Sequence, residues 1–172
     1  MKPVAVLLDE QYQVLEVWVP YYRLKEAGYP AVLLGREKGR TYKSKTGYPA
    51  EAEASYADIR PEDTRGVVIP GGFAPDFMRR HPEPARFVRS VCAAGKLTAA
   101  ICHGGWMLVS AGVLKGRRAT CFYAIKDDLV NAGADYVDEE VSVDGNIVTA
   151  RKPDDLPAFC REMLRFLAAA HE

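Results

Sequence analysis

Short, continuous runs of hydrophobic residues recur along the chain, and polar or glycine-containing segments separate them. Four of these runs are rich in aliphatic residues and too short to be helices, which is typical of parallel strands buried on both faces. They span residues 3–8, 30–34, 66–69 and 98–101. The pattern predicts a sheet with parallel strands, and the first run is expected to be central.

Between and after these runs, hydrophobic positions return at the spacing of one face of a helix. A helix is expected over 14–27 and ends at Gly28, because glycine commonly follows the last helical turn. Further helices are expected over 75–80, 84–94, 106–111, 125–131 and 153–169. Strands that alternate with helices in this way predict a doubly wound α/β sandwich.

Two stretches in the first half depart from this alternation. Residues 35–48 combine three glycines with alternating polar and aromatic positions, which indicates a hairpin that leaves the parallel sheet. A short extended piece is expected over 51–56.

A second hairpin is expected near the end of the chain. Residues 136–143 and 147–150 flank Asp144-Gly145-Asn146, and Asp-Gly is a strong signal for a two-residue hairpin turn. A further short strand is expected over 118–122. We therefore expect one domain over residues 1–172, with a mostly parallel sheet and a β-hairpin appendage.

The balance of charged residues bears on which partners the protein is expected to bind. Lys and Arg number 23, and so do Asp and Glu, so the formal net charge is zero. No long-range field therefore favours nucleic acid or an anionic membrane. The apolar runs are too short to cross a bilayer, and the first residues lack the pattern of a signal peptide. A cytoplasmic location is expected.

The four cysteines occur singly, without the spacing of a metal site or a redox pair. The three histidines do not recur at ligand spacing with them, so no metal is expected; they are His81, His103 and His171. Cys92, Cys121 and Cys160 are expected to be buried thiols in a reducing compartment. Cys102 has a different neighbourhood.

Cys102 follows a buried strand and precedes a helix, so it is expected on a sharp turn that holds its sulfur at the edge of the sheet. Free backbone N–H groups and the helix dipole favour the thiolate there. Gly104 and Gly105 allow backbone to approach the sulfur closely. The stretch is interpreted as a nucleophile elbow that carries Cys in place of Ser.

The turns after residues 8, 69 and 101 would meet at one edge of the sheet if the three strands are neighbours. That edge would bring together Glu16, Gly71-Gly72 and Cys102-His103. Cys102 would attack a substrate, and a nearby carboxyl would tune the charge of the sulfur. Backbone N–H groups of the glycine turn and of the turn after Cys102 would stabilise an oxyanion. The residues expected in this role are Gly71, Gly72 and Gly104.

His103 would need an acidic partner to fix its tautomer. Asp76, which follows the glycine turn, is the candidate, and it would act from another subunit.

The stretches VVIPGGFAPD and AAICHGGWMLVSAGVLKGRRAT, with matching segments over nearly the whole chain, resemble the PfpI-type intracellular cysteine peptidases. That family shares a superfamily with the Parkinsonism-associated deglycase and the class I glutamine amidotransferases. The resemblance implies a flavodoxin-like fold, a homodimer or homohexamer, and a Cys-His active site. It makes Cys102 the nucleophile, His103 its neighbour, Glu16 the acid beside the sulfur, and Asp76 the acid that orients the histidine across an interface.

The chain departs from the peptidase pattern at two places. Asp76 stands where the peptidases usually carry Glu, which is one methylene longer. Gln11 and Gln13 occupy the loop in which some members carry an acid. Neither departure touches the pairing of Cys102 with Glu16.

These residues leave several functions open. The first is a stress-related cysteine hydrolase that acts without a cofactor on small peptides, or on reactive aldehydes such as methylglyoxal and their adducts. The second is an oxidant sensor in which protonated Glu16 stabilises oxidised Cys102. The third is a chaperone that holds unfolded proteins without catalysis.

Overall fold

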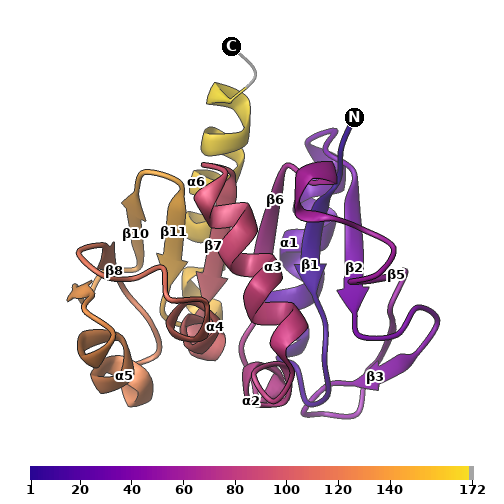
Figure 1. Cartoon of the computed structure of the whole chain (residues 1–172), viewed down its shortest axis with the longest axis horizontal. Coiled ribbons are helices and arrows are strands. Elements are labelled where there is room, and N and C mark those ends of the chain that lie inside the picture. The colour runs from indigo at the N-terminus through magenta and orange to yellow at the C-terminus, as the bar shows by residue number, and fades with distance from the viewer. Residues whose placement is uncertain (171–172) are drawn as a thin grey trace.

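The computed structural model describes residues 1–170, and its centre is a seven-stranded sheet with helices on both faces (Figure 1). The strand order is β10-β11-β7-β6-β1-β2-β5. Every neighbouring pair is parallel except β10 and β11. The strands are β1 (Val4–Leu7), β2 (Ala31–Gly35), β5 (Ala54–Ser55), β6 (Gly66–Ile69), β7 (Leu97–Ile101), β10 (Val141–Asp144) and β11 (Ile147–Ala150).

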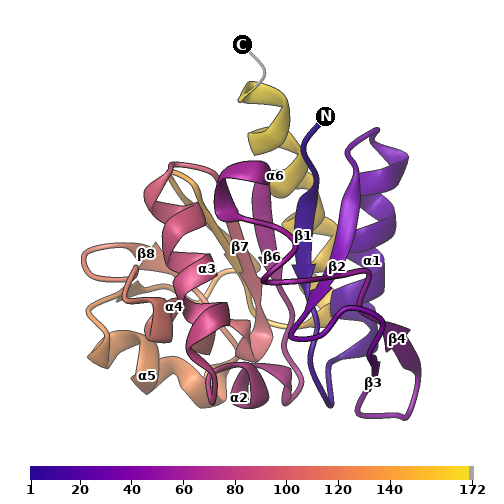
Figure 2. The ribbon, with the colours of Figure 1, turned by 45° about the vertical axis from the view of Figure 1, so that its right-hand side comes forward.

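The four aliphatic runs form β1, β2, β6 and β7, as predicted. All residues of β1, β6 and β7 are buried, because helices cover both faces of the sheet. The helices are α1 (Val14–Glu26), α2 (Ala74–Met78), α3 (Pro82–Ala93), α4 (Gly105–Ala111), α5 (Lys126–Asn131) and α6 (Leu156–Ala169). α1 and α6 pack together on one face, and α3 and α4 cover the other (Figure 2).

Two small sheets flank the main one. β3 (Thr41–Lys43) and β4 (Pro49–Glu51) form an antiparallel hairpin, whose second strand lies just beyond the predicted range of 35–48. β8 (Arg118–Ala119) and β9 (Asp135–Tyr136) pair in parallel.

The predicted strand over 136–143 is wrong in its middle. Tyr136 belongs to β9, and β10 starts only at Val141. Two acidic residues between β9 and β10 form ion pairs with arginines: Asp138 with Arg151, and Glu139 with Arg118. The predicted strand over 118–122 is shorter for a related reason, since it has only the two-residue β9 as its partner.

The predicted hairpin appendage is part of the main sheet. β11 pairs in parallel with β7, so only β10 adds an antiparallel edge. The turn at Gly145 is the one that the Asp-Gly signal predicted.

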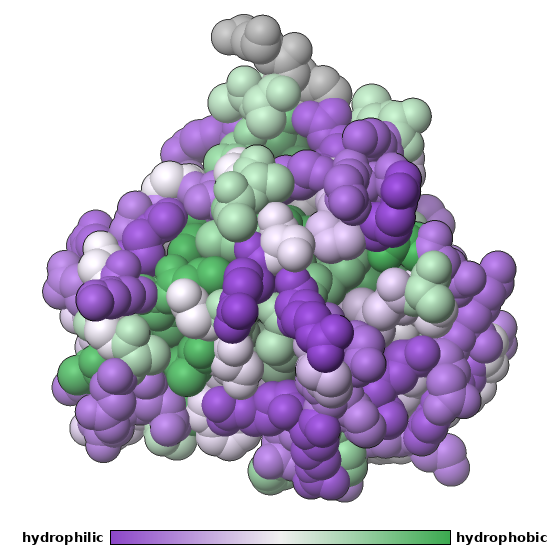
Figure 3. Space-filling model, in the orientation of Figure 1, coloured by the Kyte–Doolittle hydropathy of each residue, from purple (hydrophilic) through white to green (hydrophobic). Residues whose placement is uncertain are grey.

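The parallel strands point downward in Figure 1, so the carboxyl ends of β1, β6 and β7 lie at its lower edge. The start of β1 and the end of α6 lie at the opposite edge. Within the described chain no helix combines the length and apolar composition that crossing a membrane requires. The face over α3, α4 and α5 shows separate hydrophobic patches among hydrophilic residues (Figure 3).

No group of three or more potential ligand side chains within residues 1–170 is arranged to hold a metal ion. His171, one of the three histidines considered above, lies outside the described residues.

Candidate active site

β6 lies between β1 and β7, so the three turns predicted to converge do meet at one edge of the sheet. The loop after β1 leads into α1, which carries Glu16. The loop after β6 carries the glycine pair, and Cys102 follows β7 directly. The structure thus brings together the residues that the sequence placed on three separate segments.

Cys102 adopts a left-handed backbone conformation with φ of +60°. A side chain other than glycine is strained in this region, and such strain is concentrated at functional turns. A 3-10 turn (Cys102–Gly104) and then α4 follow at once. The backbone carbonyl of Cys102 accepts a hydrogen bond from the N–H of Phe122 at 3.3 Å. This geometry is the sharp strand-to-helix turn expected of a nucleophile elbow.

Two glycines of the site are required by close contacts. A methyl group at Gly71 would lie 2.7 Å from Oε2 of Glu16 and 2.8 Å from Cβ of Cys102. One at Gly104 would lie 2.5 Å from the carbonyl oxygen of Ile69. The absent side chains therefore let the acid, the cysteine and the end of β6 pack against one another.

Glu16 is fully buried, although acidic residues in a first helical turn are usually solvated. Its Oε2 accepts a hydrogen bond from the N–H of Gly71 at 2.7 Å, so that N–H is engaged with the acid. Its Oε1 is buried as well. Among the described residues no group forms a hydrogen bond with this oxygen. Burial raises the pKa of Glu16 to about 7, against the opposing effects of Gly71 and Cys102. Near neutral pH the carboxyl therefore exchanges its proton readily.

The pKa of the Cys102 thiol is raised to about 12, first by burial and then by the negative charge of Glu16. The sequence predicted that the turn would favour the thiolate. This prediction is wrong while Glu16 is ionised. The N–H groups of His103 and Gly72 do point at the sulfur and favour its charge. They are outweighed by the burial of the sulfur and by the nearby carboxylate of Glu16.

His103 lies beside the sulfur, with Nδ1 3.3 Å from Sγ of Cys102. Its ring stacks on Phe122 at 5.0 Å between centroids and meets Trp106 edge-on at 5.3 Å. Burial and the charge of Lys45 lower the pKa of His103. The imidazole is therefore neutral near neutral pH and is able to accept a proton.

Asp76 lies on α2 and is half-exposed. It forms an ion pair with Arg80, one helical turn away. Within residues 1–170 no hydrogen bond joins it to His103, so the chain by itself does not assemble a Cys-His-Asp arrangement.

Sequence reasoning missed Lys45, which lies between β3 and β4. Its ammonium nitrogen is 5.6 Å from the centroid of the Phe73 ring, and its charge lowers the pKa of both Glu16 and His103. Lys45 reaches the site because Tyr12 forms bridges with both Ser44 and the glycine turn. No local pattern in the sequence announces such long-range bridges.

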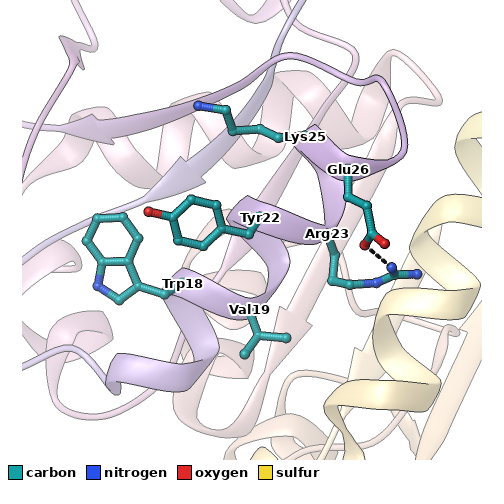
Figure 4. A pocket seen from close by; sticks show the side chains of 6 residues that line it. All are labelled: Trp18, Val19, Tyr22, Arg23, Lys25 and Glu26. Carbon is teal, nitrogen blue, oxygen red and sulfur yellow. Dashed lines mark hydrogen bonds and ion pairs between the residues drawn. The ribbon is translucent and has the colours of Figure 1, made fainter.

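A hollow of about 720 Å³ lies along α1, and none of the candidate active-site residues lines it (Figure 4). The rings of Trp18 and Tyr22 stack in it at 5.7 Å, and an ion pair joins Arg23 and Glu26. Its lining includes neither a cysteine nor a histidine, so the candidate active site is the edge at Cys102.

The fold and the cysteine on its strand-to-helix turn define a class of α/β proteins with a nucleophile elbow. Residues 2–166 match the DJ-1/PfpI family, and the chain belongs to that family. This confirms the resemblance derived from the motifs.

Two curated relatives align over nearly their whole length. Deglycase PfpI of Pyrococcus furiosus is 38% identical over 164 residues, which are 95% of this chain and 98% of that protein. YraA of Bacillus subtilis, named as a candidate cysteine protease, is 40% identical over 166 residues, which are 96% of this chain and 98% of that protein.

A solved structure shares the fold. It is a two-domain protein from Anabaena variabilis with DJ-1/ThiJ/PfpI-like and ferritin-like domains, at a TM-score of 0.95 and 42% identity. The match covers 98% of this chain and 48% of that one, so the chain spans about half its length. The expected flavodoxin-like α/β fold is confirmed.

Proposed function

We propose that this protein is a cysteine-dependent enzyme that acts on small reactive aldehydes and on the adducts they form with other molecules. The observation that carries the proposal is the placement of Cys102, at φ of +60°, with its sulfur beside His103 Nδ1 and buried Glu16. The deglycase name of a relative that is 38% identical supports the aldehyde-adduct chemistry.

Glu16 controls the charge of the sulfur in this proposal. When Glu16 is protonated, its repulsion of the thiolate disappears, and its hydroxyl is able to donate a hydrogen bond to the sulfur. The N–H groups of Gly72 and His103 then act unopposed by a neighbouring carboxylate. Neutral His103 accepts the thiol proton, so the pair forms a reactive thiolate in a closed site.

The thiolate adds to the aldehyde carbon, and the carbonyl electrons move to oxygen, which takes up the proton from the thiol. In methylglyoxal a proton then moves from the former aldehyde carbon to the neighbouring carbonyl carbon, and the hydroxyl proton of the adduct moves to the ketone oxygen, with the acid and histidine as carriers. The resulting thioester is cleaved by water to a carboxylate and free Cys102. No external oxidant or cofactor is needed, because one carbon is oxidised as the other is reduced.

The test compares purified wild type with Cys102→Ala and Cys102→Ser on methylglyoxal and on a fluorogenic peptide. We expect turnover of methylglyoxal by wild type and a loss of at least about a hundredfold in both variants, the size typical of losing a covalent nucleophile. Turnover of the peptide alone would favour the peptidase alternative, to which the name of YraA points. Equal activity in wild type and Cys102→Ala would exclude covalent catalysis.

An oxidant sensor remains a second proposal, because one buried oxygen of Glu16 has no hydrogen-bond partner among the described residues. In its protonated form this oxygen would donate to a sulfinate on Cys102. Peroxide should then add oxygen to Cys102 before the three other cysteines, as read by mass spectrometry. Oxidation of all four at similar rates would contradict it.

A further inference from the structure

Lys45 presents a cation at the candidate active site that makes no ion pair with a carboxylate among residues 1–170. The ammonium lies over the face of Phe73, and its charge is felt by both Glu16 and His103. Those two side chains contact the Cys102 sulfur from separate elements, α1 and the 3-10 turn. The ammonium therefore acts on both side chains that flank the sulfur, and Lys45 is exposed to solvent.

The backbone holds Lys45 at this place through the loop after β1. The N–H of Lys45 donates to the carbonyl of Tyr12 at 3.0 Å, and the N–H of Gln11 donates to that of Lys43 at 2.7 Å. Gln11 in turn accepts a hydrogen bond from the N–H of Phe73 at 2.9 Å. The lysine loop and the glycine turn beside Cys102 are thus tied to the same two residues, which fixes the backbone at Lys45 relative to that turn.

Aromatic rings lie beside His103 and under the ammonium of Lys45. His103 stacks on Phe122, which is partly exposed, and the exposed ring of Phe73 lies under the ammonium. Apolar rings suit a short carbon chain, whereas an unpaired ammonium suits an anionic end group. The combination is suited to a small electrophile that carries a carboxylate.

We propose that Lys45 binds the carboxylate of the electrophile that Cys102 attacks, so that the site prefers small oxo acids to neutral aldehydes of similar size. The proposal rests on the role of Cys102 as nucleophile. The thiolate adds to the carbonyl carbon, the carbonyl oxygen takes the proton released by the thiol, and the carboxylate stays ionised against the ammonium. Lys45 is a specificity-determining residue in this scheme.

The test uses two alkylating agents of nearly equal shape, iodoacetate and iodoacetamide. Each forms a bond between carbon and sulfur with release of iodide, and only the first carries a carboxylate. Rates of Cys102 labelling are measured by mass spectrometry on wild type, Lys45→Met and Lys45→Arg. The ratio of the two rates cancels any change in the pKa of Cys102, because both reagents need the same thiolate.

We expect Lys45→Met to lower the ratio of iodoacetate to iodoacetamide rates by about fivefold, the size of one exposed charge pair. Lys45→Arg should keep the ratio, and so should Lys43→Met, which removes an exposed cation from β3 of the same hairpin. Glyoxylate, an aldehyde with a carboxylate, should protect Cys102 from iodoacetamide in wild type at lower concentration than in Lys45→Met.

An unchanged ratio in Lys45→Met would overturn the proposal. Equal losses with both reagents would do so as well, because Lys45 would then act only on the reactivity of the sulfur. Methylglyoxal turnover is followed in parallel. A lowered ratio in a protein without turnover would leave the role of Lys45 standing and remove the proposed function.

Discussion

Cys102 combines a strained backbone with the side chain that the proposed chemistry needs. A non-glycine residue at φ of +60° costs on the order of 1 kcal/mol, which glycine does not incur. A cysteine at this position therefore lowers the free energy of unfolding relative to glycine. Such a cost is expected where function requires a particular side chain.

This strain predicts the order of stability of two variants. Cys102→Gly should be more stable than Cys102→Ala by about 1 kcal/mol, since both lose the sulfur and only alanine keeps the strain. Urea unfolding followed by circular dichroism measures the difference. A more stable alanine variant would show that the turn is unstrained.

Glu16 makes the stability of the protein depend on pH. The ordinary pKa of a glutamate is 4.5, and burial raises the pKa of Glu16 to about 7, so the folded state holds the proton more tightly than the unfolded chain. Stability contributed by this group is therefore present below pH 4.5 and is lost as the pH rises to about 7, by about 3 kcal/mol in total. Glu16→Gln should remove this loss.

The measurement is the free energy of unfolding of wild type and Glu16→Gln at several pH values across that range. Wild type should lose stability relative to the variant as the pH rises. A difference that stays constant with pH would mean that Glu16 has the same pKa in the folded and the unfolded protein.

At the scale of elements, the turn between β7 and α4 depends on a glycine against the end of β6. Gly104→Ala should destabilise the protein by about 2 to 3 kcal/mol, because its methyl group would lie 2.5 Å from a backbone oxygen. Gly105→Ala is the matched control, since its methyl group would lie 3.2 Å from the flexible side chain of Leu129.

Thermal and urea unfolding of the two variants test the contrast. The change in Gly105→Ala should stay within about 1 kcal/mol, because alanine is the better helix former. Equal stability of both variants would show that the end of β6 moves aside.

The elements that the sequence predicts well are those whose burial is continuous. β1, β6 and β7 are buried throughout, and β2 over its last three residues, so their largely apolar pattern depends little on neighbours. β8 and β9 have two residues each and exist only because they pair with each other. The predicted strand over 136–143 is wrong because Tyr136 pairs with β8 as part of β9, and β10 begins only at Val141.

The residues of the candidate active site also differ in how well the sequence predicts them. Cys102, Glu16 and the glycine turn follow from strand ends that meet at one edge, and the sequence shows those ends. The direction of the thiol pKa shift depends first on how deeply the sulfur is buried and then on the charge of Glu16, which only the packed structure shows. Lys45 depends on bridges between distant segments.

At the scale of the whole molecule, the proposed role of Asp76 requires a second copy, because within the described chain it pairs with Arg80. If Asp76 of one subunit orients His103 of another, Asp76→Asn and Cys102→Ala subunits should complement each other. Mixed oligomers would contain sites with an intact cysteine and an intact acid.

The experiment unfolds and refolds the two variants together and measures methylglyoxal turnover. We expect more activity in the mixture than the sum of the separate variants, with oligomer size followed by light scattering. No gain in a mixed oligomer would place the acid and the cysteine in unrelated sites.

The beginning of β1 and the end of α6 lie across the sheet from the carboxyl ends that carry Cys102 (Figure 1). A bead, biosensor surface or fluorescent label coupled through either of these segments would therefore stand clear of the sulfur. Immobilised protein should therefore keep the edge at Cys102 open to soluble electrophiles, so that their reactions with the sulfur could be compared on a solid support.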